Sequence, residues 1–128
     1  MEKPITILIA ADHRLVAKGW QFILGLNPKF HAINGCKDFE SVLLRAKTLR
    51  PDMILMDINM KRMQEMNVIP FIEKVSPDSQ VLGISMYTFP GVSDTLIQLG
   101  VSGYLTKSSS IKELFEAIAE LKAGNKYL

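Results

Sequence analysis

Four polar side chains whose types suit phosphate and metal chemistry follow short apolar runs in this sequence of 128 residues. Two are carboxylates, one is a hydroxyl and one is an ammonium group. Taken singly, each is also common as a helix cap or a surface residue, so only their repeated position favours a shared site. The residues are Asp12, Asp57, Ser85 and Lys107, and they lie within two residues after the runs 5–11, 53–56, 81–84 and 102–105.

These side chains match the needs of phosphoryl chemistry. The carboxylates of Asp12 and Asp57 can hold a hard cation such as Mg²⁺, which prefers oxygen ligands. A carboxylate can also accept a phosphoryl group and form an acyl phosphate. Lys107 offers positive charge to phosphate oxygens and Ser85 offers a hydrogen bond, so the set is suited to receiving a phosphoryl group.

The elements that must position these residues alternate short β-branched runs with longer amphipathic ones. Buried strands that alternate with helices predict an α/β protein of five strand–helix units, a doubly wound parallel sheet whose site lies at the carboxyl ends of the strands. Asp38 can cap the second helix, and Ser110 with Glu113 has the spacing of a capping box. The expected strands cover 5–9, 30–34, 53–56, 81–84 and 102–105. The expected helices cover 13–26, 39–50, part of 66–75, 90–99 and 111–123.

The first expected helix carries apolar residues at helical spacing, which is typical of the face that packs on a core. Cys36 is expected to be a small buried hydrophobe. Because it is the single cysteine, it cannot form an internal disulfide, and a reducing intracellular setting fits. The apolar residues of the helix are Leu15, Val16, Gly19, Phe22, Ile23 and Leu26.

Composition excludes several classes of protein. The length predicts one domain, and 48% hydrophobic residues are too many for a disordered chain. A net charge of +2 is too small to argue for nucleic-acid binding. The first apolar run is far shorter than the ~20 residues of a membrane span, so no membrane anchor is expected there.

Three stretches of the sequence resemble the receiver domain of bacterial two-component response regulators. They are 7–13 with Asp12-His13, 51–60 with Asp57-Ile58-Asn59, and 100–107 with Tyr104-Leu105-Thr106-Lys107. The likeness covers essentially all of residues 1–128 and is strongest to the NarL/FixJ (LuxR-type) subgroup. It implies a flavodoxin-like fold with strand order 2-1-3-4-5, and a helix-turn-helix output domain that is not among these residues.

The resemblance also assigns roles. It implies a response regulator that receives its phosphoryl group from a sensor histidine kinase, uses Mg²⁺, works in the cytoplasm in transcription regulation and is not an enzyme. It leaves open a homodimer through the fourth helix or through the first and fifth, and it implies no direct nucleic-acid contact by these residues. By position, the resemblance makes Asp57 the phosphoacceptor. It gives Asp12, Asp57 and the Asn59 backbone carbonyl the role of metal ligands. It also implies that Ser85 and Lys107 contact the phosphoryl group and that Ser85 and Tyr104 are the switch pair.

Two departures from the family pattern stand out. Ala11 occupies the position of one of the two usual acids, which predicts weaker Mg²⁺ binding and slower phosphorylation. The loop 60–65 lacks the usual Pro and Gly residues, so its shape should differ. Arg14, Lys61 and Arg62 would add positive charge nearby, either to hold an anion or as solvated surface charge.

Two other functions stay open at this point. A pseudo-receiver would have the same fold and would signal through a partner or ligand without aspartyl phosphorylation. Ala11 and the altered loop favour it, and the retained Asp12, Asp57, Ser85 and Lys107 oppose it. A flavin carrier of the same architecture would need a loop rich in Ser, Thr and Gly after the first strand, and Asp12-His13-Arg14-Leu15 does not supply one.

Overall fold

A computed structural model describes residues 3–58, 68–85, 91–106 and 108–128 of the chain. The side chains of residues 68, 92, 93, 95 and 96 are also outside the description. Among the described residues, no helix is both long enough and apolar enough to cross a membrane.

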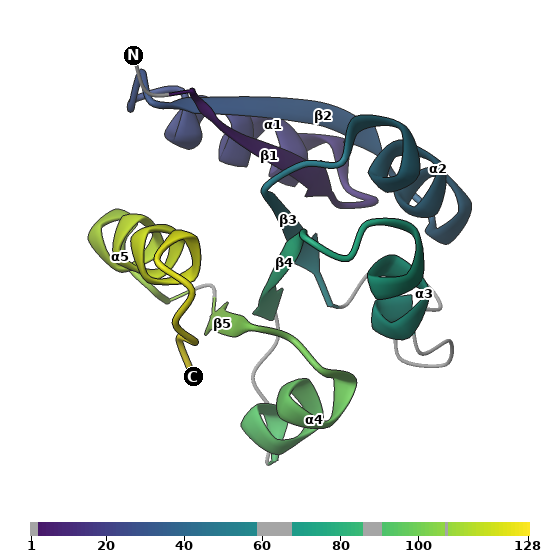
Figure 1. Ribbon diagram of the computed structural model, residues 1–128. Helices are drawn as coiled ribbons and strands as arrows, with labels where there is room; N and C mark the ends of the chain where they lie inside the picture. Colours follow the sequence, from purple (N-terminus) through teal and green to yellow (C-terminus); the bar gives the residue numbers. More distant parts are fainter. Residues whose placement is uncertain (1–2, 59–67, 86–90, 107) are drawn as a thin grey trace.

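Five parallel strands form one sheet in the order β2-β1-β3-β4-β5 (Figure 1). This confirms the predicted doubly wound α/β fold and its strand order. β3 lies at the centre of the sheet and is buried along its whole length, as expected for a strand covered on both faces. The strands are β1 (Ile5–Ala10), β2 (Phe30–Cys36), β3 (Met53–Asp57), β4 (Gln80–Ser85) and β5 (Gly103–Thr106).

Helices cover both faces of this sheet. One core cluster joins the sheet to α2 and α3, and a second joins it to α1 and α5. Each predicted helix is present, with ends that differ by a few residues; Pro70 lies within the first turn of α3, where proline is tolerated. The helices are α1 (Arg14–Leu24), α2 (Phe39–Leu49), α3 (Val68–Val75), α4 (Val92–Leu99) and α5 (Ile111–Lys122).

The buried face of α1 differs from the predicted one. The helix buries Ala17, Trp20 and Leu24, whereas Leu15 and Phe22 are 85% and 73% exposed. Val16 and Ile23 are partly buried at the margin of the core. The prediction was wrong because α1 carries apolar residues around most of its circumference, and the indole of Trp20 decides which side packs on the sheet.

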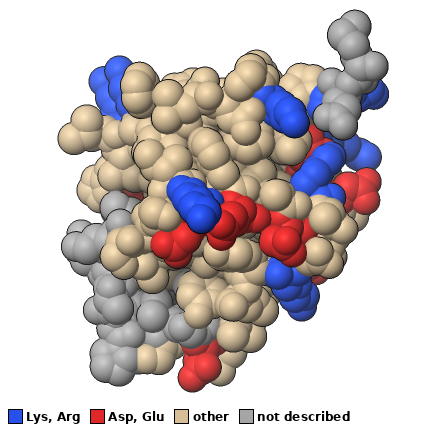
Figure 2. Space-filling model, turned by 90° about the vertical axis from the view of Figure 1, so that its left-hand side faces the viewer, with Lys and Arg blue, Asp and Glu red and all other residues tan. Residues whose placement is uncertain are grey.

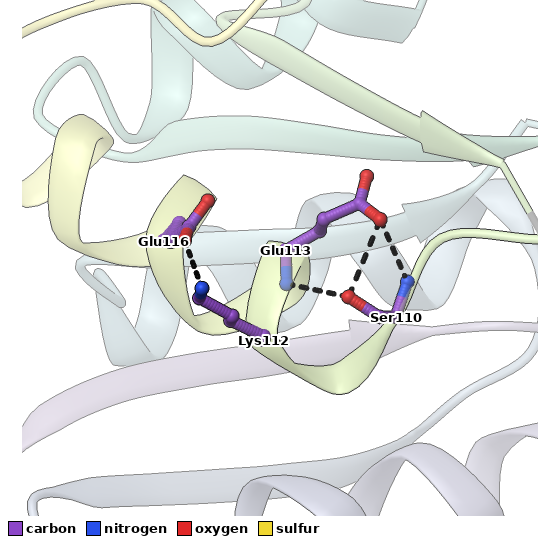
Figure 3. Close-up of polar contacts among 4 residues, drawn as sticks. All are labelled: Ser110, Lys112, Glu113 and Glu116. Atoms are coloured by element: carbon purple, nitrogen blue, oxygen red, sulfur yellow. Dashed lines mark hydrogen bonds and ion pairs between the residues drawn. The ribbon is translucent and has the colours of Figure 1, made fainter.

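Both predicted helix caps are confirmed. The Asp38 carboxylate accepts hydrogen bonds from the hydroxyl of Ser41 at 2.6 Å and from its backbone N–H at 2.8 Å, and these hold the pKa of Asp38 below its usual value. At α5, the Ser110 hydroxyl accepts from the Glu113 N–H at 3.1 Å (Figure 3). The Glu113 carboxylate accepts from the Ser110 N–H at 3.2 Å, which completes the capping box.

The two edges of the sheet are finished differently. At the β2 edge, Leu8 lies opposite Ile33 and Ala10 lies opposite Cys36, so β2 contains one extra residue, a β-bulge. At the β5 edge, Gly103 forms a parallel bridge with Tyr127. The chain after α5 therefore covers the edge of β5 and protects it from pairing with another strand.

Candidate functional site

The strand register places the predicted site residues at one edge of the sheet. Asp57 lies opposite Ile84 in the β3–β4 pair, and Ser85 lies opposite Thr106 in the β4–β5 pair. On the other side of β3, Ala10 pairs with Met56, so the next residue, Ala11, continues beside Asp57. The side chains of Asp57 and Ser85 thus come from neighbouring strands at the same carboxyl edge.

Asp57 and Ser85 are almost completely buried, each with 1% of its surface exposed. Within the described residues, Asp57 is the single charged residue in the buried class. Burying a carboxylate is costly unless other groups compensate its charge, so such a residue is more often kept for chemistry than for stability.

Asp12 lies at the end of β1 and is more accessible. Its side chain is 26% exposed, and the carboxylate Oδ1 lies 3.7 Å from Nε2 of His13. His13 itself is 71% exposed. Asp12 is therefore partly open to solvent at the same edge of the sheet that carries Asp57.

Tyr104 lies on β5, next to Gly83 of β4, and its partly buried side chain packs against the core cluster that includes α2 and α3. Its backbone N–H donates to the carbonyl oxygen of Tyr127 at 3.0 Å, and the Tyr127 N–H donates to Ser102 at 3.0 Å. The predicted switch aromatic is thus tied to the chain that follows α5.

The tail residue Tyr127 lies near an acidic surface. Figure 2 shows acidic side chains gathered on the face that α5 occupies. Partial desolvation of the Tyr127 hydroxyl, together with the carboxylates of Glu116, Glu113 and Glu120, raises the pKa of Tyr127. Three glutamates of α5 therefore lie near the Tyr127 hydroxyl beside β5.

Several predicted positions lie outside the described residues. These include Lys107, the Asn59 carbonyl and the altered loop 60–65 with Lys61 and Arg62. Their roles stay predictions.

A hollow that the sequence did not predict lies beside the site. It has a volume of about 590 Å³ and lies between the start of α1 and the ends of β1 and β2. The four-residue spacing of Arg14 and Lys18 on one helix was a signal for its basic rim. The residues that line it are Ala11, Asp12, Arg14, Ala17, Lys18, Asn34, Gly35, Cys36 and Lys37.

The donor set at the strand ends fits Mg²⁺. Asp12 and Asp57 supply carboxylate oxygens from neighbouring strands, and Mg²⁺ is commonly bound by one or two carboxylates together with water and phosphate. Ala11 is also buried at this edge, but its methyl group has no oxygen that could bind a cation.

Comparison with known proteins agrees with this geometry. The family model of the response regulator receiver domain matches residues 7–119. The transcriptional regulatory protein DegU of Brevibacillus brevis is 31% identical over 127 residues, which are 99% of this chain and 54% of that protein. The nitrate/nitrite response regulator NarL of Escherichia coli K12 is 25% identical over 99% of this chain and 59% of that protein.

Solved structures agree in fold. A LuxR-family two-component response regulator from Aurantimonas sp. SI85-9A1 superposes with a TM-score of 0.86 at 23% identity, covering 98% of this chain and 90% of the other. The isolated receiver domain of RcsB from Salmonella enterica serovar Typhimurium, studied with the phosphomimetic BeF₃⁻, gives a TM-score of 0.82 at 20% identity, covering 98% and 93%.

The chain spans a little over half the length of the curated relatives that it matches. The family match, in contrast, covers most of the chain, and the relatives are NarL/FixJ-type regulators. The chain belongs to the receiver domain family of two-component response regulators, in its NarL/FixJ subgroup.

Proposed function

We propose that this receiver domain accepts a phosphoryl group on Asp57. The single observation that carries the proposal is the burial of Asp57, which is 1% exposed. It lies at the end of the central strand β3, next to the end of β4, where Ser85 carries its hydroxyl. A carboxylate oxygen would attack the phosphorus of a phosphohistidine, the P–N bond would break, and the imidazole would leave. The product is an acyl phosphate.

The surrounding residues have separate tasks in this proposal. Asp12, Asp57 and the Asn59 carbonyl would hold Mg²⁺, which when bound supplies positive charge to the phosphoryl oxygens. Ser85 would donate a hydrogen bond and Lys107 a charge-assisted one to the new phosphoryl group. Ser85 is buried beside Asp57, which supports its part.

Phosphorylation would then act as a switch. The modification adds about two negative charges at the sheet edge and draws Ser85 toward them, which shifts the balance between two arrangements of β4 and β5. Tyr104 follows on β5, and its hydrogen bond to Tyr127 links that strand to the tail. Receiver domains of this family are signalling modules, and this route is how we propose the signal leaves the site.

The wider setting is part of the same proposal. Residues 1–128 form one receiver domain whose phosphodonor is a sensor histidine kinase in the cytoplasm. A helix-turn-helix output domain in a longer chain would regulate transcription, and the phosphorylated form would be a homodimer. The DegU and NarL relatives, which are regulators longer than this chain, support it.

The test is the intact mass of the protein after incubation with a small phosphodonor and Mg²⁺. We expect a gain of one phosphoryl group in the natural chain and in the control Asp78→Asn, an exposed carboxylate elsewhere. The Asp57→Asn variant, shown to be folded by circular dichroism, should gain none. No gain in the natural chain would overturn the proposal in favour of a pseudo-receiver.

A second experiment addresses Ala11. Because its small side chain lies beside Asp57 and has no donor, an Ala11→Asp variant should bind Mg²⁺ about tenfold more tightly, the usual scale of a single supporting carboxylate. The measurement is a fluorescence or calorimetric Mg²⁺ titration. Equal affinities of the two proteins would contradict the predicted effect of Ala11.

A further inference from the structure

We propose that the hollow between α1 and the end of β2 binds a small organic phosphate. The hollow borders the phosphoacceptor site, since Ala11 and Asp12 line it, but the proposal does not depend on phosphorylation of Asp57. It rests on the charge, the size and the lining of the hollow.

The side chains that line the hollow carry more positive than negative charge, although the Asp38 carboxylate lies near Lys37 and Cys36. Three cations stand on its rim, Arg14, Lys18 and Lys37, against one carboxylate, that of Asp12. All three cations are exposed, and no ion pair joins any of them to a carboxylate of the described residues. Cations held around one concavity create a positive potential that attracts an anion.

The three cations come from two different elements. Arg14 and Lys18 are four residues apart on α1 and so share a face of that helix, and Lys37 follows β2 directly. A phosphate between these elements could accept hydrogen bonds from both sides. A guanidinium suits such a group because its planar donors match two phosphate oxygens at once.

The floor of the hollow is apolar. It is formed by Ala11, Ala17 and Cys36, each less than 5% exposed. Burial raises the pKa of the Cys36 thiol to about 11, so this thiol adds no negative charge that would repel an anion. A ligand with a phosphate head and a compact apolar body therefore fits better than inorganic phosphate.

The size of the hollow agrees with that ligand class. Its volume of about 590 Å³ falls within the range of small-molecule sites, about 300–1,000 Å³. Asn34 and Gly35, at the bulge of β2, form one wall. An aromatic or branched phosphate monoester fills part of this space with its phosphate at the basic rim.

The experiment is a titration followed by backbone amide NMR, with the metal chelated to remove binding through Mg²⁺. The probes are inorganic phosphate and phenyl phosphate. We expect saturable shifts for amides of residues 11–18 and 34–37, with tighter binding of phenyl phosphate. Binding should weaken as salt rises, because the contact is electrostatic.

Matched variants separate this site from general surface charge. The pair Lys18→Met and Lys37→Met removes two rim cations and should weaken binding about fivefold to tenfold, on the scale of exposed ion pairs. The pair Lys47→Met and Lys74→Met removes two exposed lysines of α2 and α3 and should leave binding unchanged. Equal weakening by both pairs, or the absence of saturable shifts, would overturn the proposal.

Two further arms define the source of the phosphate. Asp57→Asn should bind phenyl phosphate as the natural chain does, and loss of binding would place the ligand at the phosphoacceptor instead. Phosphatidylglycerol vesicles should not retain the protein. Retention by vesicles without any response to phenyl phosphate would show a membrane surface rather than a small-molecule site.

Discussion

The backbone N–H of Tyr104 donates a hydrogen bond of 3.0 Å to the carbonyl oxygen of Tyr127. The two residues are therefore mechanically joined, although one is on β5 and the other follows α5. The neighbouring Gly103 has almost no room for a side chain. A Cβ placed there would lie 3.1 Å from the Tyr127 carbonyl oxygen and 3.1 Å from Cδ1 of Leu82. The close approach of the tail to β5 depends on this glycine.

We predict that Gly103→Ala destabilises the protein by about 1–3 kcal/mol, the usual cost of overpacking. The measurement is urea unfolding. Deleting residues 125–128 should reduce the penalty without removing it, because the contact with Leu82 remains. Gly19→Ala serves as the control: it lies in α1 with nothing within 4 Å of the added methyl, and it should stabilise the helix by up to about 1 kcal/mol. A neutral Gly103→Ala would show that the tail moves away freely.

The buried side of α1 gives a second prediction. Trp20→Ala should cost about 3–5 kcal/mol, because the indole is 9% exposed and packs against the sheet. Phe22→Ser, two residues further along the same helix, should change the free energy of unfolding by about 0.5 kcal/mol or less, since its ring is 73% exposed. Chemical denaturation of both variants checks this, and the reverse order of effects would mean that the other face of α1 is buried.

The third prediction concerns Asp52, which joins distant parts of the chain. Its carboxylate accepts from the Thr6 N–H at 2.9 Å and from Nζ of Lys122 at 3.1 Å. Partial burial works to raise the pKa of Asp52, but the Thr6 hydrogen bond and the Lys122 ammonium outweigh it and hold that pKa below its usual value.

A lowered carboxyl pKa stabilises the fold above the pKa of the unfolded chain, about 4, and the contribution is lost as pH falls through the folded value. Asp52→Asn should therefore cost up to about 1 kcal/mol at pH 7 and less near pH 3. Thermal unfolding at both pH values is the measurement. Lys112→Met, which breaks an exposed pair on α5 with a 4.0 Å separation, is a control expected to have little effect at either pH.

The fourth prediction concerns the thiol of Cys36. It is 1% exposed and donates to the Ser41 carbonyl at 3.6 Å, so a thiol reagent should label it only as fast as the protein opens. Because its pKa rises from 9.0 to about 11, the folded thiol keeps a proton that the unfolded chain has released between these values. Stability should therefore fall as pH rises from 9 to 11, and the decline should be smaller in Cys36→Ala. Rapid labelling of the folded protein would contradict the buried position.

Much of the fold follows from local patterns. The apolar runs at β1, β3 and β4 predict buried strands, because a short apolar run between turn signals is typical of a buried parallel strand. Asp38 and Ser110 marked their helix starts through hydrogen bonds that span only three residues. Such signals are short-range and can be read from the sequence.

Other features depend on distant contacts and could not be predicted. Two sides of α1 are apolar, and its orientation depends on which side packs better on the sheet. The apolar pattern of the sequence does not show which side that is. The bridge between Gly103 and Tyr127 joins residues that are far apart in sequence and of no special type. Of the site, Asp57 and Ser85 were placed correctly because parallel strands end at one edge, whereas the hollow needed the register of β1 against β2.

The bulge in β2 has a consequence for how this protein can change during evolution. Ile33 and Cys36 face the same core although three positions separate them, since Asn34 and Gly35 together oppose the single Ile9. The extra residue lies in the wall of the hollow, and Gly35 adopts a φ of 115°, a backbone conformation that favours glycine. Deleting one residue here would restore regular pairing with every core side chain in place. Loss of this one residue would thus reshape the hollow while the fold beneath it is retained.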